Sequence, residues 1–202
     1  MLDLPDPKPL LERLFRPAAA FLAANGVRPN QLTLISMWNS AAAGILAVEF
    51  PFATWPLLAI LGAMLVRLAC NHIDGIIARE HGMRTRLGGL LNEVATPFED
   101  VALYLPLALR PEMPAALIVG AVLAGALVEV AGLSAVAIGA HRRYDGPMTK
   151  VMRGACFAGL ALAIAAGLAP GQWVAATLLI VFGLLAVTAF NRLVRALQEV
   201  QS

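Results

Sequence analysis

The chain has 202 residues, of which 59% are hydrophobic, and a formal net charge of only +2. Soluble globular domains are only about half apolar, so this composition, with a mean hydropathy of +0.76, excludes an ordinary soluble domain and indicates an integral membrane protein. The small net charge gives no reason to expect a nucleic-acid partner.

The first 30 residues are predicted to form a juxtamembrane arm. An apolar stripe of Leu10, Leu11, Leu14, Phe15 and Leu22 lies opposite Glu12, Arg13 and Arg16. This pattern is typical of an amphipathic helix in the membrane interface. Pro17 predicts either a kink or the start of a second helix. Residues 1–5 lack a basic segment followed by an apolar one, so we expect no cleavable signal peptide.

Most of the remaining chain is predicted to span the membrane. A spanning helix needs about 20 mostly apolar residues, and six segments qualify: about 31–50, 56–80, 88–109, 115–140, 151–169 and 173–196. We therefore predict an all-α integral membrane protein. Residues 31–202 would form one domain of six transmembrane helices, preceded by the interfacial amphipathic arm of residues 1–30.

The charges predict how this domain is oriented. Thirteen of the fifteen basic residues lie before, between or after the spans at alternate ends, and the opposite connections hold only Arg110. By the positive-inside rule, both termini and the connection between the second and third spans are expected to be cytoplasmic. Trp55 and Trp173 fall at the predicted outer ends, where amphipathic rings favour the interface.

Residues 71–96 carry the most informative pattern of the chain. It reads Asn71-x-x-Asp74-Gly75-x-x-Ala78-Arg79, then, after eight residues, Gly88-x-x-x-Asn92-x-x-x-Thr96. Residues three or four apart share a helical face, and polar side chains inside a span are functional candidates. The spacing therefore predicts two polar faces that form a pocket near the cytoplasmic surface, in which Arg79 could bind a phosphate.

This pattern resembles the signature of the CDP-alcohol phosphatidyltransferase family, whose members have acids at the positions of Asn71, Asp74, Asn92 and Thr96. A weaker similarity is the segment Pro29-Asn30-x-x-Thr33. The resemblance implies transfer of a phosphatidyl group from a CDP-linked lipid such as CDP-diacylglycerol to a small alcohol acceptor, with release of CMP. It also implies a homodimer with a cytoplasmic active site, and we expect the bacterial inner membrane.

The resemblance implies roles for these residues. Asn71, Asp74 and Asn92 would hold Mg²⁺ or Mn²⁺; Asn71, Asp74, Gly75, Ala78, Arg79 and Gly88 would bind the CDP group; Thr96 occupies the position of the general base. Gly88 would let the third span approach the second. One bacterial branch of the family has Asn at the first and third positions but keeps the fourth acid, so Thr96 is the main departure.

Three formal negative charges are missing from the predicted pocket. Threonine cannot act as a base at neutral pH, and hard cations prefer anionic oxygen. Glu93, three residues before Thr96, is the candidate substitute for the base.

The connection after the fourth span is strongly basic. Arg142, Arg143, Lys150 and Arg153 lie there, and the turn Asp145-Gly146-Pro147 would orient them. They are predicted to bind a phosphate of the nucleotide or of the acceptor, although the positive-inside rule alone would also account for them.

Three charged residues are expected deep in the membrane. Counting about 1.5 Å per residue, Arg67, Asp100 and Glu129 come out at similar depth. We predict that Arg67 pairs with Asp100 or Glu129 and fixes the helix packing. Cys70 and Cys156 are expected to pack as small apolar residues without a disulfide.

Three functions remain open from the sequence: an active CDP-alcohol phosphatidyltransferase; a degenerate member that binds a CDP-linked lipid or a metal as a partner or sensor without turnover; and a small transporter. Transporters tend to contain internal repeats with broken helices at the midplane, and no such repeat is apparent.

Overall fold

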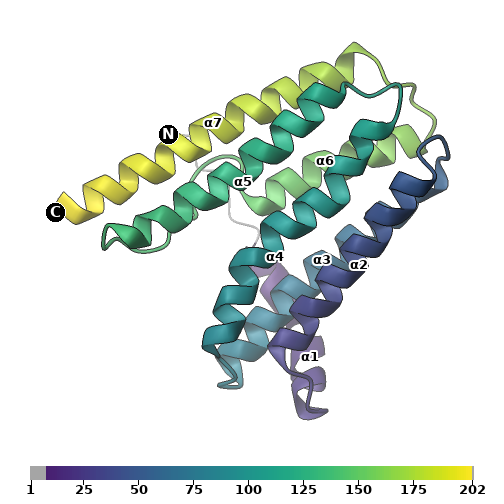
Figure 1. Cartoon of the computed structure of the whole chain (residues 1–202). Helices are drawn as coiled ribbons and strands as arrows, with labels where there is room; N and C mark the ends of the chain where they lie inside the picture. The colour runs from purple at the N-terminus through teal and green to yellow at the C-terminus, as the bar shows by residue number, and fades with distance from the viewer. Residues whose placement is uncertain (1–7, 202) are drawn as a thin grey trace.

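The computed structural model describes residues 8–201, which form seven α-helices and one 3₁₀ helix (Figure 1). The helices are α1 (Lys8–Ala24), α2 (Pro29–Glu49), α3 (Trp55–Glu80), α4 (Arg86–Tyr104), η1 (Leu105–Leu109), α5 (Ala115–Ala137), α6 (Lys150–Ala165) and α7 (Gln172–Gln201). Within these residues no strand is present, as predicted. The first seven residues of the predicted arm, on which the expectation of no signal peptide rests, lie outside this range.

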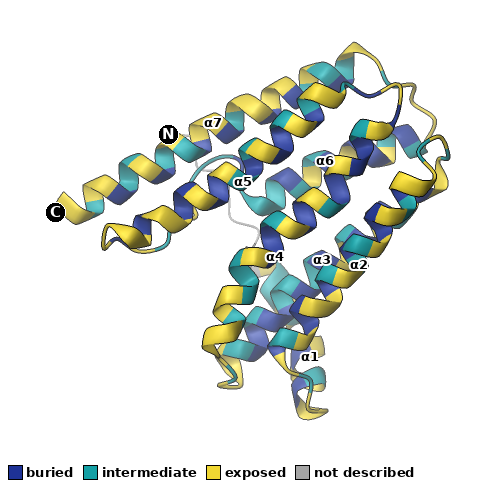
Figure 2. Ribbon diagram, viewed as in Figure 1, coloured by how far each residue is buried: buried dark blue, intermediate teal, exposed yellow. Residues whose placement is uncertain are grey.

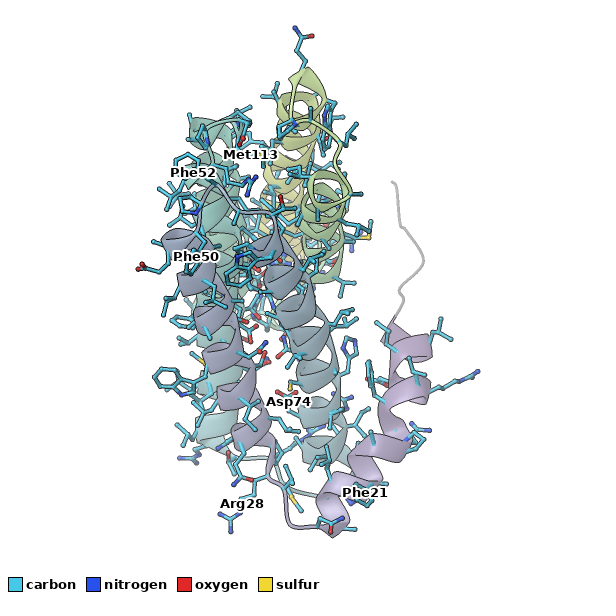
Figure 3. The ribbon with its side chains drawn as sticks, turned by 90° about the vertical axis from the view of Figure 1, so that its right-hand side faces the viewer. Phe21, Arg28, Phe50, Phe52, Asp74 and Met113 are labelled. Carbon is cyan, nitrogen blue, oxygen red and sulfur yellow. The ribbon has the colours of Figure 1, made fainter. Side chains whose placement is uncertain are left out.

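The helices form two groups that converge at one end. Helix α2 packs against both α3 and α4, α5 pairs with α7, and α6 packs mainly on α3. The groups lie close together where α3, α5 and α7 begin and separate toward the end of α3 and the C-terminus (Figure 1). We call these the narrow end and the wide end. Figure 3 shows Phe50, Phe52 and Met113 at the narrow end and Phe21 and Arg28 at the wide end.

The apolar core lies mainly between α3, η1, α5, α6 and α7. Leu57, Ile118 and Leu178 are among its fully buried members. The Tyr104 ring stacks on the Phe157 ring with centroids 4.1 Å apart. Exposed positions follow the outward faces of the helices in Figure 2, and many are large and apolar, as expected for lipid-facing surfaces.

Four helices of the described chain are long and apolar enough to cross a membrane: α2, α3, α5 and α7. The other two predicted spans correspond to α4 with η1, and to α6. Helix α6 has only 16 residues, and α4 carries Glu93, Glu99 and Asp100 among its 19. The protein is thus an all-helical integral membrane protein, and the number of six spans stays a prediction.

The amphipathic arm is one helix rather than two, with Pro17 in its interior. Phe15 and Leu22 pack against the buried apolar cluster that α1 forms with α3. On the opposite side Leu10, Leu14 and Phe21 are exposed. Two ion pairs attach the arm to the end of α3: Arg16 to Glu80 at 2.9 Å and Arg79 to Glu12 at 2.6 Å.

Small residues on α5 and α6 pack within the chain. A Cβ atom on Gly120 would lie 3.8 Å from the Phe182 ring of α7, and one on Gly154 would lie 3.6 Å from the Tyr104 hydroxyl. These contacts do not define a surface for a second copy, so the predicted homodimer stays a prediction. Cys70 and Cys156 are free, as expected.

Candidate active site

A cavity of about 1020 Å³ lies between the two helix groups at the wide end. Most predicted site residues line it: Asn71, Asp74, Gly75, Ala78, Arg79, Gly88, Asn92, Glu93, Thr96, Arg142, Arg143 and Lys150. Residues from α1, α2, α3, α4 and the connection before α6 therefore meet around one space. Of the predicted residues, Arg153 alone is absent from the cavity wall.

Asp74 is the one acid among the four signature positions. Its side chain is buried, 7% exposed, and its Oδ2 accepts a hydrogen bond from Thr33 Oγ1 at 2.8 Å. Thr33 belongs to the Pro-Asn-x-x-Thr segment at the start of α2, so the two segments singled out in the sequence meet at this carboxylate. Figure 3 shows Asp74 between the two ends of the molecule, nearer to the wide end.

Asn71 is held by a carboxylate that the sequence did not point to. Its Nδ2 donates to Glu99 Oε2 at 3.4 Å. Glu99 is fully buried, accepts from the Ser36 hydroxyl and pairs with Arg67 Nε at 2.8 Å. Glu99 thus fixes the amide of Asn71, the residue at the first signature position.

Thr96 and Glu93 lie on the α4 side of the cavity. Thr96 is 6% exposed and provides only a hydroxyl. The Arg142 guanidinium donates three hydrogen bonds to the two carboxylate oxygens of Glu93, at 2.9–3.1 Å. It also reaches Glu129 Oε2 at 2.9 Å. Glu93 therefore lies in the cavity, as its predicted role as a substitute base requires, and the Arg142 guanidinium orients its carboxylate.

Gly88 makes a close approach to a different helix from the one predicted. A Cβ atom there would lie 2.6 Å from Asn30 Oδ1, at the start of α2, and 3.0 Å from Thr85 Oγ1. The Gly88 N–H donates to that hydroxyl at 2.9 Å, which caps α4. The prediction that Gly88 allows contact with α3 is wrong, because the N-cap brings the first turn of α4 against α2.

Gly75 leaves space for the predicted phosphate-binding arginine. A Cβ atom on Gly75 would lie 3.0 Å from Arg79 Nη1. The guanidinium folds back along its own helix and its Nη2 donates to Glu12 at 2.6 Å. A ligand phosphate at Arg79 would therefore compete with a carboxylate of the arm.

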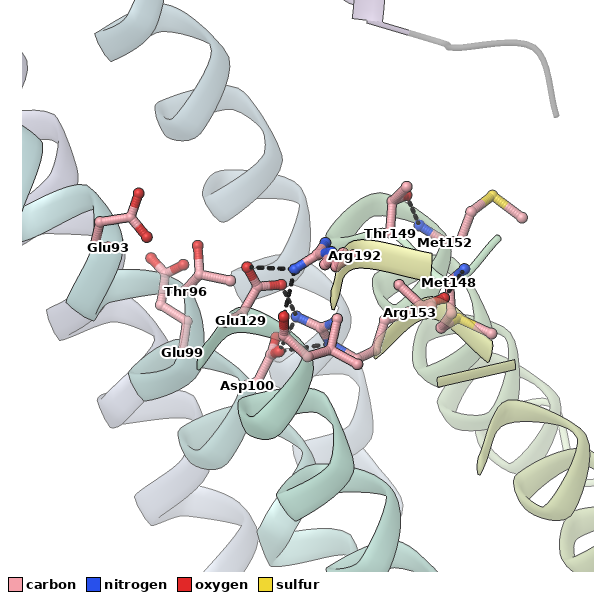
Figure 4. Close-up of polar contacts among 12 residues, drawn as sticks. Glu93, Thr96, Glu99, Asp100, Glu129, Met148, Thr149, Met152, Arg153 and Arg192 are labelled. Atoms are coloured by element: carbon pink, nitrogen blue, oxygen red, sulfur yellow. Dashed lines mark hydrogen bonds and ion pairs between the residues drawn. The ribbon is translucent and has the colours of Figure 1, made fainter. Parts of the chain in front are cut away.

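A chain of ion pairs runs from the cavity wall into the interior, and Figure 4 shows its buried members Asp100, Glu129, Arg153 and Arg192. Arg67 binds Asp100 Oδ1 at 2.7 Å, as predicted, and Asp100 also binds Arg153 at 2.5 Å. Arg153 and Arg192 each approach Glu129 to 3.4 Å. With Arg142, Glu93 and Glu99 the chain comprises four arginines and four acids, so its charges balance.

Arg153 is part of this chain and not of the cavity wall. It is fully buried, because its place in the first turn of α6 directs it toward Asp100 and Glu129. The prediction that it binds a phosphate receives no support from this position.

The connection between α5 and α6 is fixed by Asp145. Its carboxylate accepts from Arg143 Nε at 2.7 Å and from Arg195 Nη1 at 2.5 Å. Burial raises the pKa of Asp145, but the hydrogen bonds from Arg195 and Arg143 outweigh it and hold the pKa below its usual range. The Tyr144 ring lies 4.6 Å from the Arg142 guanidinium carbon.

The donor set at the signature does not fit a pair of divalent cations. Asn71, Asp74, Asn92 and Thr96 offer one carboxylate, two amides and one hydroxyl, and the carboxylate already accepts from Thr33. Mg²⁺ and Mn²⁺ prefer anionic oxygens. Within residues 8–201 there is no group of three or more His, Cys, Asp or Glu side chains suited to a metal ion. We therefore derive no chemical step through a metal.

Sequence reasoning missed several residues of this region. Glu12, Arg192 and Arg195 line the cavity, and Glu99 holds the signature side chain of Asn71. A signal was present for some of them, since Arg192 and Arg195 share one helical face and Glu99 follows Thr96 by three residues.

Comparisons with known proteins were made by sequence and by structure. No family model matches the chain. It is 38% identical over 161 residues to "Inner membrane protein YnbA" of Escherichia coli K12, covering 78% of this chain and 79% of that protein.

Two structures of phosphatidylinositol phosphate synthase (PgsA1) from Mycobacterium tuberculosis have the same fold. One, with CDP-DAG bound, has a TM-score of 0.65 and 20% identity and covers 94% of each chain. The other, in complex with manganese and citrate, has a TM-score of 0.68 and 18% identity and covers 93% of this chain and 89% of that one. The chain is therefore a relative of this inner membrane protein and has the fold of the phosphatidylinositol phosphate synthase, and its signature positions lie where that fold brings them to one cavity.

Proposed function

We propose that this protein transfers the phosphatidyl group of a CDP-linked lipid, such as CDP-diacylglycerol, to a small alcohol and releases CMP. One observation carries the proposal: every signature position and most of the predicted basic residues line a single cavity. A protein of the same fold holds CDP-DAG, which supports a CDP-linked substrate. The relative named an inner membrane protein supports a bacterial inner membrane location. By the positive-inside rule, the wide end is proposed to face the cytoplasm.

The reaction replaces one phosphorus–oxygen bond by another. The acceptor hydroxyl oxygen bonds to the phosphorus of the phosphatidyl group, the bond from that phosphorus to the bridging oxygen breaks, and CMP leaves with the bridging oxygen. Arg79, Arg142, Arg143 and Lys150 are proposed to bind the phosphate oxygens, and cations positioned there stabilise charge that develops on them. Gly75, Ala78 and Gly88 are proposed to give the nucleotide access to the backbone.

The hydroxyl proton needs an acceptor, and Glu93 is the proposed one. It lies in the cavity wall, on the helix of Thr96 and three residues before it. Arg142 fixes its carboxylate. Thr96 occupies the position of the family's general base, but its hydroxyl cannot accept a proton at neutral pH.

The test is CMP release by the purified protein in detergent, with CDP-diacylglycerol and a panel of alcohols: glycerol 3-phosphate, inositol, inositol phosphate and serine. We expect slow release by the natural chain. Thr96→Asp should raise kcat about 100-fold or more with little change in KM, because a positioned general base contributes about 10²–10⁴-fold. Glu93→Gln should abolish turnover by the natural chain but spare the Thr96→Asp variant.

Thr96→Asn is the matched control, since it changes the side chain without adding a base, and should not accelerate release. Binding of CDP-diacylglycerol without CMP release by either the natural chain or Thr96→Asp would favour the binding-only alternative. Absence of CDP-diacylglycerol binding would contradict the proposed substrate itself.

A further inference from the structure

The charges around the cavity favour an anionic ligand without help from a metal. Seven arginine or lysine side chains and five aspartate or glutamate side chains line it, an excess of two positive charges. Acids at Asn71, Asn92 and Thr96, as in the family pattern, would turn this into an excess of one negative charge. A cavity of that kind would repel a diphosphate unless it bound cations, whereas the excess of positive charge in the cavity of this chain attracts one.

Most of the cations in the wall already have a carboxylate partner. Arg79 pairs with Glu12, Arg142 with Glu93 and Glu129, and the remaining arginines that face the centre are similarly engaged. Among residues 8–201, Lys150 and Arg84 are the two cavity-lining cations with no carboxylate within 4.0 Å. Arg84 is exposed, whereas Lys150 is half-buried.

Lys150 is placed where its charge acts on the signature. It is the first residue of α6, directly after the N-cap Thr149, whose side chain accepts from the Met152 N–H. It lines the cavity together with Asp74 and Glu129, and the guanidinium of Arg67 also acts on its charge. The N-terminus of a helix favours anions, so the helix dipole and the ammonium act in the same direction at this point.

We infer that the cavity binds the diphosphate of its CDP-linked ligand directly through Lys150, without a divalent cation. The inference rests on the proposed function and names how that site holds its substrate. Lys150 supplies a compact point charge with three donors in the cavity where the signature lacks three anions. Hydrogen bonds between charged partners are among the stronger ones in proteins, so one ammonium can make a measurable contribution to affinity.

The experiment is calorimetric titration of the full chain in detergent with CDP-diacylglycerol, in EDTA and again in excess Mg²⁺. For the natural chain we expect the two Kd values to agree within about twofold. Lys150→Met should weaken binding about tenfold or more, because a charge-assisted contact is lost, and Lys150→Arg should restore most of the affinity. Arg86→Met removes one cation at the same end but outside the cavity and should leave Kd unchanged.

A second variant tests the inference from the opposite side, by restoring the three missing acids. The triple substitution Asn71→Asp, Asn92→Asp and Thr96→Asp should bind CDP-diacylglycerol only when Mg²⁺ is present. This test remains informative even if Lys150→Met fails to fold. The melting temperature of each variant shows whether it is folded.

Each contrary outcome has its own meaning. Binding by the natural chain that is lost in EDTA overturns the inference and leaves the proposed function standing. If Lys150→Met weakens binding of glycerol 3-phosphate but not of CDP-diacylglycerol, the lysine serves the acceptor and the inference is wrong. Failure of CDP-diacylglycerol to bind in either buffer overturns the proposed function and the inference with it.

Discussion

Asp100→Asn should destabilise the protein strongly, because this carboxylate joins two buried arginines. Asp100 is 2% exposed and accepts from Arg67 at 2.7 Å and from Arg153 at 2.6 Å. The substitution keeps the shape of the side chain and removes its charge, so the four arginines of the ion-pair chain, three of them buried, would face three acids. Removing one partner of a buried ion pair costs about 3–5 kcal/mol.

The expected shift in melting temperature follows from that cost. For a chain of about 200 residues each kcal/mol corresponds to about 2–4 °C, so Asp100→Asn should lower the Tm by about 6–20 °C. Cys70 is 8% exposed, so a thiol-reactive fluorophore reports its exposure as the detergent-solubilised protein is heated.

Glu80→Gln is the matched control for this measurement. It also neutralises one acid of an ion pair, with Arg16, but both side chains are about half exposed. Exposed pairs contribute about 0–1 kcal/mol, so the control should shift the Tm by only a few degrees. Equal shifts for Asp100→Asn and Glu80→Gln would refute the view that the buried chain of ion pairs holds the helices together.

Two further predictions concern packing and pH. Gly44→Ala would place a methyl group against the Ala102 carbonyl of α4, so it should cost about 1–3 kcal/mol and lower the Tm. The folded-state pKa of Asp145 is held low by Arg195 and Arg143, so its contribution to stability is present above its unfolded pKa of about 3.9 and is lost as the pH falls through the lower folded value. The Tm difference between the natural chain and Asp145→Asn, followed by tryptophan fluorescence, should therefore narrow below about pH 4.

Each of these two predictions can be checked against a matched measurement. Gly62→Ala puts the same methyl group where nothing lies within 4 Å, and the higher helix propensity of alanine should leave the Tm equal or slightly raised. A Tm drop in Gly62→Ala as large as in Gly44→Ala would show that the α2–α4 contact is not responsible. A Tm difference for Asp145→Asn that is the same at pH 3 and pH 7 would contradict the role of its ion pairs.

Helix positions and depths could be predicted because they depend on local rules. Apolar runs and a fixed rise per residue located the helices to within a few residues and predicted that Arg67 pairs with Asp100 or Glu129, of which the structure has Asp100. Pro17 remained ambiguous, since proline is tolerated in a first turn and also inside a helix that accepts the distortion. The structure has one continuous α1.

The arrangement of side chains around the cavity could be predicted only in part. Spacing placed Asn71 and Asp74 on one face, but it could not show that α2 supplies Thr33 to that face. Position in a basic loop favoured Arg153 as a phosphate ligand, yet its side chain lies among the acids of α4 and α5. That Lys150 has no carboxylate within 4.0 Å among residues 8–201 depends on the packing of several elements at once, which no local pattern contains.

The attachment of α1 has a consequence for how a lipid reaches the cavity. An amphipathic helix lies in the plane of the membrane surface with its apolar side toward the acyl chains, and the exposed Leu10, Leu14 and Phe21 form such a side. If α1 lies in the membrane interface as predicted, the ion pairs that join it to the end of α3 would fix the depth of the cavity relative to the lipid headgroups. A lipid could then place its headgroup in the cavity while its tails stay in the bilayer, and no extraction from the membrane would be required.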